Sequence, residues 1–154
     1  MVPIKEAIDS SSWLHCEYEK YNEVYKFRVK INSFRKLSLS EVDNPEKIEN
    51  LDSSATLWLM GIEFINLSKT PIHPSYGPPN LVLVDPDDFC FHLFEDYHFE
   101  NGSNFSSHTG MNRFHSAQLI PKIKAVGSLI FQLPDDDDAV YSLSIKNNGI
   151  VQEV

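Results

Sequence analysis

The sequence predicts an all-β fold, an antiparallel β-sandwich of about seven to nine strands. Residues 24–34 and 57–67 alternate apolar and polar side chains with the period of two that is typical of half-buried strands. Short apolar runs also recur through the second half of the chain, each bounded by Pro, Gly, Asn or Asp. No segment has the periodicity of a helix longer than about two turns.

Residues 1–22 are mixed in character, and we expect them to form an N-terminal extension to a single domain over residues 23–154. Residues 4–8 are too few to predict a helix by themselves, and the serines at 10–12 end whatever precedes them. The strand at 24–34 then places Phe27, Val29 and Ile31 on one face. In the strand at 57–67 both faces are partly apolar, which predicts a central strand.

The remaining strands are shorter. Residues 81–84 and 89–94 flank Asp85, Pro86, Asp87 and Asp88, the composition of a type I turn, and this predicts a hairpin. Strands are also expected at 113–119, 126–133 and 139–145, with an acidic turn at 135–138. Residues 37–52 are expected to be a surface connection, and the prolines between 71 and 79 exclude a central strand there. This number and spacing of strands is typical of an immunoglobulin-like sandwich.

The formal net charge of −9 opposes binding to nucleic acid or to anionic membranes, both of which need clustered Lys and Arg. An acidic surface suits a basic partner, although it also serves solubility alone. The two cysteines leave open one disulfide or two free thiols, and Cys90 is expected to be a small buried residue in an aromatic strand. No transmembrane run or export signal is visible, which predicts a cytoplasmic protein, or a secreted or lipid-anchored one if a leader has been removed.

Several of these segments together resemble a known family. They are a strand closing on Asn66, Leu67 and Ser68, an Asp-rich turn between 84 and 91, the step Pro121-Lys122, and a strand ending in Phe131-Gln132-Leu133-Pro134. The pattern over about residues 24–146 is similar to the bacterial immunoprotective extracellular immunoglobulin-like domains, a largely uncharacterised family. The resemblance implies an immunoglobulin-like sandwich without catalytic residues, usually exported or lipid-anchored.

Motifs for chemistry are weak. His92, His98, His108 and His115 fall in one stretch, but their spacing fits no zinc motif, so no metal or other cofactor is predicted. The Asp clusters at 85–88 and 135–138 lack the spacing of a calcium loop and are expected to be solvated turns, not necessarily at the same end. No nucleophile elbow or phosphate-binding loop is present either. The sequence therefore predicts a protein that is not an enzyme.

The sequence favours a module that binds another protein or a ligand through its loops. Aromatic side chains in loops often anchor partners. The candidate binding residues lie in the long polar loop at 95–112, directly after it, and in the Pro-rich segment: Tyr76, Tyr97, His98, Phe99, Phe105, His108 and Arg113. Two alternatives remain, an acidic cytosolic immunity protein or inhibitor for a basic toxin, and a metal-dependent hydrolase that uses the histidines.

Overall fold

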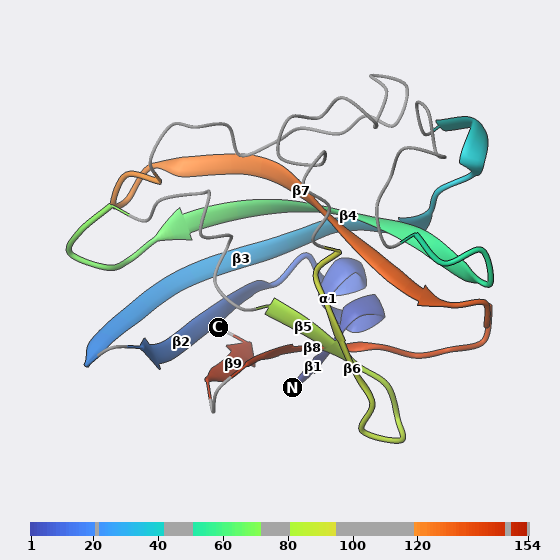
Figure 1. The fold of residues 1–154 in the computed structure, drawn as a ribbon. Helices are drawn as coiled ribbons and strands as arrows, with labels where there is room; N and C mark the ends of the chain where they lie inside the picture. Colours follow the sequence, from blue (N-terminus) through green and yellow to red (C-terminus); the bar gives the residue numbers. More distant parts are fainter. Residues whose placement is uncertain (21, 42–50, 72–80, 95–118, 147–148, 154) are drawn as a thin grey trace.

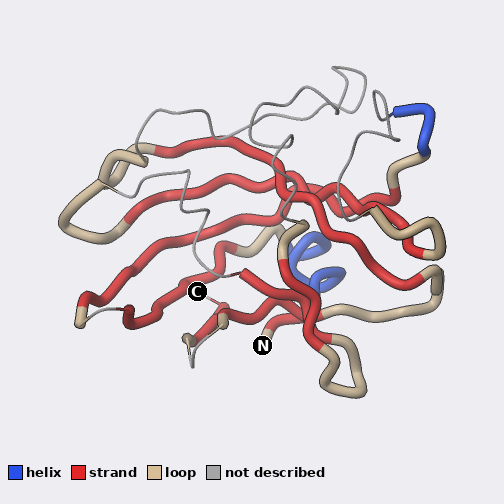
Figure 2. Tube along the Cα trace, viewed as in Figure 1, coloured by secondary structure: helices blue, strands red, loops and turns tan. Residues whose placement is uncertain are grey.

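The computed structural model describes residues 1–20, 22–41, 51–71, 81–94, 119–146 and 149–153. In this part of the chain, nine strands form two antiparallel sheets, and the predicted β-sandwich is confirmed (Figures 1 and 2). The four-stranded sheet has the order β1-β8-β5-β6 and the five-stranded sheet β7-β4-β3-β2-β9. The strands are β1 (Val2–Pro3), β2 (Trp13–Lys20), β3 (Glu23–Lys36), β4 (Ala55–Asn66), β5 (Leu81–Val84), β6 (Cys90–His92), β7 (Lys124–Pro134), β8 (Ser142–Ile145) and β9 (Ile150–Glu153). The helices are α1 (Ile4–Ser10) and the short 3-10 turn η1 (Leu39–Glu41).

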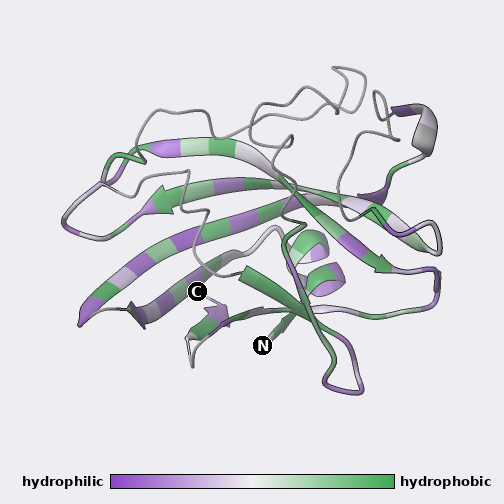
Figure 3. Cartoon of the chain, viewed as in Figure 1, coloured by the Kyte–Doolittle hydropathy of each residue, from purple (hydrophilic) through white to green (hydrophobic). Residues whose placement is uncertain are grey.

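The two strongly alternating segments form the middle of the five-stranded sheet. In β3, Phe27, Val29 and Ile31 are buried, whereas Lys26 and Arg28 face solvent, so the colours of hydropathy alternate along the ribbon (Figure 3). The register between β3 and β4 shifts after Ile31, which marks a β-bulge. This shift keeps the late residues of the long strand in contact with the core.

The N-terminal residues differ from the expected extension, because they belong to both sheets. β1 pairs with β8, and β2 pairs with β3 on one side and with β9 on the other. The short α1 contributes buried Ile4 and Ala7, and it ends where Ser11 adopts a left-handed φ of 52°. The apolar contacts of these residues across the sandwich explain why a segment without a strong local pattern is ordered. Strands β1 and β2, together with β9, close the sheets with residues from the two ends of the chain.

The predicted hairpin is confirmed, with β5 paired to β6 around the Asp85 turn. The chain then leaves the four-stranded sheet at Leu93, which forms a bridge with Phe131 of β7. The Phe94 amide donates to the Ile130 carbonyl at 2.8 Å. Along this side, hydrogen bonds therefore join the two sheets, and on the other side β1 and β8 lie against β9.

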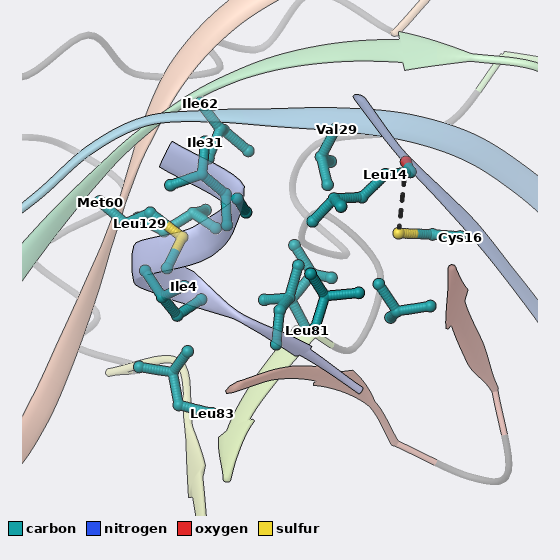
Figure 4. Packing of buried hydrophobic residues seen from close by; sticks show 14 of the residues in the cluster. Ile4, Leu14, Cys16, Val29, Ile31, Met60, Ile62, Leu81, Leu83 and Leu129 are labelled. Carbon is teal, nitrogen blue, oxygen red and sulfur yellow. Dashed lines mark hydrogen bonds between the residues drawn. The ribbon is translucent and has the colours of Figure 1, made fainter. Parts of the chain in front are cut away.

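The main core lies between the sheets and includes α1 (Figure 4). Figure 4 shows Ile4 of the helix among Met60 and Leu129 of the five-stranded sheet, with Leu81 and Leu83 of the facing sheet nearby. Burial of each such side chain contributes about 1.5–3 kcal/mol.

A second, smaller cluster covers the opposite face of β4. Leu57, Leu59 and Ile130 pack there with Leu37 and Phe94. Strand β4 is therefore apolar on both faces and lies between β3 and β7, which confirms the predicted central strand.

Asn66 ends β4 and is fully buried. Its Nδ2 donates to the carbonyls of Thr70 and Leu119, both at 2.9 Å, and its Oδ1 accepts from the Ser68 amide at 2.8 Å. Its backbone carbonyl accepts from the Lys122 amide at 2.8 Å. One buried side chain thus fixes the turn after β4 and the segment that leads into β7.

Candidate functional site

All seven residues predicted to bind a partner lie outside the described residues, at positions 76, 97, 98, 99, 105, 108 and 113. Of the four clustered histidines, the structure describes only His92, which is exposed on β6. Within the described ranges, no group of three or more His, Cys, Asp or Glu is placed to hold a metal ion. The candidate site below therefore comes from the described residues, and the sequence did not predict it as a site.

The site is built on the two Asp-rich turns, which the structure brings to the same end of the sandwich. Val84 pairs with both Cys90 and Ser142, so the turn after β5 and the segment before β8 leave the four-stranded sheet side by side. Burial raises the pKa of the Tyr141 hydroxyl, and the nearby carboxylates of Asp85 and Asp136 raise it further. Both turns therefore act on one side chain. We call the group Asp85, Asp87, Asp88 and Asp135–Asp138 the acidic end.

Within each turn, one aspartate fixes the backbone and leaves its neighbours exposed. Asp85 Oδ1 accepts from the amides of Asp87 and Phe89, both at 2.9 Å. Asp136 Oδ1 accepts from the Asp138 amide at 3.0 Å. Asp87 and Asp138 are themselves exposed. The turns thus present carboxylates to solvent on a locally hydrogen-bonded backbone.

Aromatic side chains from both sheets form the base of this end. Phe34 of β3 stacks on Trp58 of β4 with ring centroids 4.8 Å apart. Tyr141 packs edge-on against Phe34 at 6.5 Å and against Phe91 of β6 at 5.7 Å. Because these rings come from four separate segments, they tie the two sheets together directly behind the acidic turns.

The side chain of Lys36 contacts the carboxylates of the acidic end. Its Nζ forms ion pairs with Asp137 and, at 3.6 Å, with Asp135. It also lies 5.8 Å from the centroid of the Trp58 ring. The hydrogen bond to Asp137 is the largest of the contributions that raise the pKa of Lys36, which is therefore charged at neutral pH. The arrangement shows that an ammonium group fits between the carboxylates and the aromatic base.

Apolar side chains lie exposed beside both turns. Phe89 follows the first turn and is 65% exposed, and Val140 follows the second and is 57% exposed. Exposed apolar groups next to charged ones are typical of protein-binding surfaces more than of small-molecule clefts. Two exposed apolar side chains therefore lie beside the carboxylates of the acidic end, and packed aromatic rings lie behind them.

The structure corrects the predicted burial of Cys90 and shows that neither cysteine forms a disulfide. Cys90 is exposed and not buried, because the pairing of Leu83 with Phe91 turns Phe91 toward the core and its neighbours outward. Phe94 does not share the exposed face of His92, since the chain has by then crossed to β7. Cys16 is buried in β2, and both cysteines are free.

This difference predicts which thiol reacts. Burial raises the pKa of the Cys16 thiol from 9.0 to about 12, so its reactive thiolate is scarce in the folded state. Treatment of the native protein with iodoacetamide near pH 8 should add one label, on Cys90, and treatment in urea should add two. Intact mass measurement distinguishes the two results, and a Cys90→Ser variant should take no label while folded. Rapid labelling of Cys16 in the native protein would contradict the described burial.

The raised pKa of Cys16 also makes the stability of the fold depend on pH. A thiol whose pKa is higher in the folded than in the unfolded state stabilises the fold fully below the unfolded value. That contribution is lost as the pH rises from about 9 towards 12. Urea unfolding at pH 8 and at pH 11 should therefore show a smaller loss of stability at high pH for Cys16→Ala than for the wild type.

Comparisons with known proteins find proteins of similar fold, and none of these has a described activity. No protein-family model matches the chain, and no curated protein matches it. A conserved hypothetical protein from Bacillus anthracis is similar in structure, with a TM-score of 0.53 and 12% identity over 93% of this chain and 97% of that one. An uncharacterised β-sandwich protein from Clostridium difficile aligns over 90% of this chain and 89% of that one, with a TM-score of 0.46 and 14% identity. Among the described helices, none is long and apolar enough to cross a membrane. At this identity, the first likeness extends to the fold alone.

Proposed function

We propose that this protein is a non-enzymatic interaction domain whose acidic end binds a partner protein with a basic, partly apolar surface. The observation that carries the proposal is the placement of exposed Phe89 and Val140 beside two Asp-rich turns. The resemblance to immunoglobulin-like domains without catalytic residues supports it. In this reading, a cationic group of the partner lies between the carboxylates as Lys36 does, and apolar groups cover Phe89 and Val140.

An inhibitor or immunity protein is the form of this proposal in which the partner is a basic enzyme. The net charge of −9 and the concentration of aspartates at one end support it, because they would steer a cationic partner to the site. Association should then slow as salt is added, since exposed charges are screened beyond about 10 Å at 0.1 M.

Site-specific photo-crosslinking in living cells tests the proposal. A photoreactive amino acid is placed at Phe89, at Val140, or at Ile150, a control position on β9 that is 47% exposed. We expect positions 89 and 140 to capture the same protein, and position 150 not to capture it. The captured product should be lost when Asp87→Lys and Asp138→Lys are introduced, because these changes reverse exposed charges without removing the turn-fixing Asp85 and Asp136. Equal capture at all three positions, or capture unaffected by the reversal, would rule the acidic end out as the binding surface.

A further inference from the structure

A second surface with the opposite charge lies around the tight turn that precedes β7. The Ile123 amide donates to the Ile120 carbonyl at 3.2 Å, with Pro121 next and Lys122 at a φ of 65°. This is the geometry of a type II turn, in which the third residue must take a left-handed conformation. The turn leaves Ile120 56% and Ile123 59% exposed. Two branched apolar side chains therefore project from it.

Lysines gather around these isoleucines. The Lys122 amide donates to the Asn66 carbonyl, and the Leu67 amide donates to the Lys26 carbonyl, both at 2.8 Å. These two bonds bring the ends of β3 and β4 beside the turn, and Lys69 follows a short distance along the chain. We call this surface the basic turn: Lys26, Lys69, Ile120, Lys122, Ile123 and Lys124, all of them exposed. Lys124 forms an ion pair with Glu63 of β4 at 3.0 Å, so it adds little net charge to this surface.

The basic turn and the acidic end lie at opposite ends of the long sheet. Strands β4 and β7 are antiparallel, with Ala55 opposite Pro134 at one end and Ile65 opposite Lys124 at the other. Asp135 follows directly on the first pair, and the basic turn directly precedes the second. These two oppositely charged surfaces therefore lie at opposite ends of the sandwich.

The two surfaces also match in their apolar content. Eight large apolar side chains are exposed in the described chain, namely Met1, Val24, Phe89, Ile120, Ile123, Val126, Val140 and Ile150. Phe89 and Val140 lie beside the acidic end, and three others lie in or directly after the basic turn. The two surfaces are thus opposite in charge, and each has exposed apolar side chains that a contact between them would remove from water.

We infer that the partner that fits the acidic end is the basic turn of a second copy of this chain. The inference rests on the proposed function, since it uses the same acidic end and names its occupant. Because the two surfaces are different and lie at opposite ends, the contact is head-to-tail and leaves one of each surface free in every pair. Such a contact continues from copy to copy unless its geometry closes a ring. The net charge of −9 on each copy repels a second copy and weakens the contact between them. The assembly should therefore grow as the protein concentration rises.

Sedimentation velocity over rising protein concentration tests this inference with the protein itself. For the wild type we expect the weight-average mass to rise past twice the monomer mass of 17.6 kDa. Two variants each remove most of the charge of one surface, Asp87→Lys/Asp138→Lys at the acidic end and Lys69→Glu/Lys122→Glu at the basic turn. Each variant alone should remain monomeric, because one of the two complementary surfaces is weakened in every copy. An equal mixture should form mixed pairs, because the intact acidic end of one variant then meets the intact basic turn of the other.

A matched control separates the local effect from net charge. Lys5→Glu/Lys146→Glu changes the net charge as much as the basic-turn variant does, at exposed positions outside both surfaces, and it should assemble like the wild type. A wild type that stays monomeric at every concentration would overturn the inference, and so would a mixture of the two variants that does not assemble. The proposed function is tested independently: if position 89 captures a different protein in cells, the acidic end still binds a partner, and only the second copy is excluded.

Discussion

Asn66→Asp should destabilise the protein by about 3–5 kcal/mol at neutral pH, the cost of an uncompensated buried charge. The substitution keeps the shape of the side chain but places a carboxylate oxygen where Nδ2 donates to the carbonyls of Thr70 and Leu119, both at 2.9 Å. Two favourable contacts then become repulsive in a site that is fully shielded from solvent. Asn66→Ala should cost less, about 2–3 kcal/mol, because it leaves those groups unpaired without adding a charge.

The Asn66→Asp variant should also gain a pH dependence that the Asn66→Ala variant lacks. Burial beside carbonyl oxygens raises the folded pKa of the new carboxyl above its unfolded value of about 3.9. The penalty is therefore small below about pH 4 and grows as the pH rises, by about 1.4 kcal/mol per pH unit, until the folded carboxyl ionises. Urea unfolding at pH 4 and pH 7 measures it as the difference between variant and wild type. Gln152→Glu, the same exchange on the exposed edge strand β9, should change stability little at either pH. An Asn66→Asp protein as stable as the wild type at pH 7 would contradict the described hydrogen bonds.

Gly149→Ala should destabilise the protein by about 2–3 kcal/mol, because β9 begins where there is no room for a side chain. A Cβ at position 149 would collide with Ile145 Cγ2 and would lie 2.8 Å from Ile145 Cβ and 2.9 Å from Tyr18 Cβ. Two of these atoms are Cβ atoms and cannot move away without their backbones. The strain would fall where β9 joins β2, and urea or thermal unfolding measures it.

Gly61→Ala is the matched comparison. There the added Cβ meets only Ser33 Oγ, at 2.7 Å, and that hydroxyl can rotate. We expect a loss below about 1 kcal/mol, which Ser33→Ala should remove in the double variant. No such single change should rescue Gly149→Ala, since Ile145→Ala leaves both Cβ contacts in place. Equal losses for the two glycine variants would show that close approach at β9 is not what limits position 149.

Strands with a strong local pattern could be predicted from the sequence. The alternation through Phe27, Val29 and Ile31 and the two apolar faces of the next strand are local properties, and they correspond to β3 and β4. The hairpin around Asp85 followed from turn chemistry, and the strand predicted at 126–133 corresponds to β7. In each of these segments the local preference and the tertiary position agree.

The missed elements depend on distant partners. Strand β2 buries Leu14, Cys16 and Tyr18, but the half-exposed Trp13 on its other face weakens the apolar contrast. Strand β9 buries only Val151 and is ordered by its pairing with β2. No window of neighbouring residues contains that information, so the N-terminal segment was expected to be an extension.

The candidate site could not be predicted for a related reason. Both Asp-rich turns were visible in the sequence, but their position at one end follows from the pairing of β5 with β8, which joins segments about sixty residues apart. The exposure of Phe89 arises in the turn itself, where Asp88 takes a left-handed φ of 67° and the Phe89 amide donates to Asp85 Oδ1. Conversely, the loop residues that the sequence favoured remain predictions, because they lie outside the described residues.

The pairing of the first strands with the last ones has a consequence for the newly made chain. β1 needs β8 and β2 needs β9, so neither of these early strands has its full set of hydrogen bonds until β8 and β9 have been synthesised. Translation at about 5–20 residues per second leaves the early segment waiting for several seconds. During that time the apolar side chains of Leu14, Cys16 and Tyr18 lack the strand that completes their cover. Until β9 is made, the outer edge of β2 therefore presents unpaired backbone groups, which can pair with another chain.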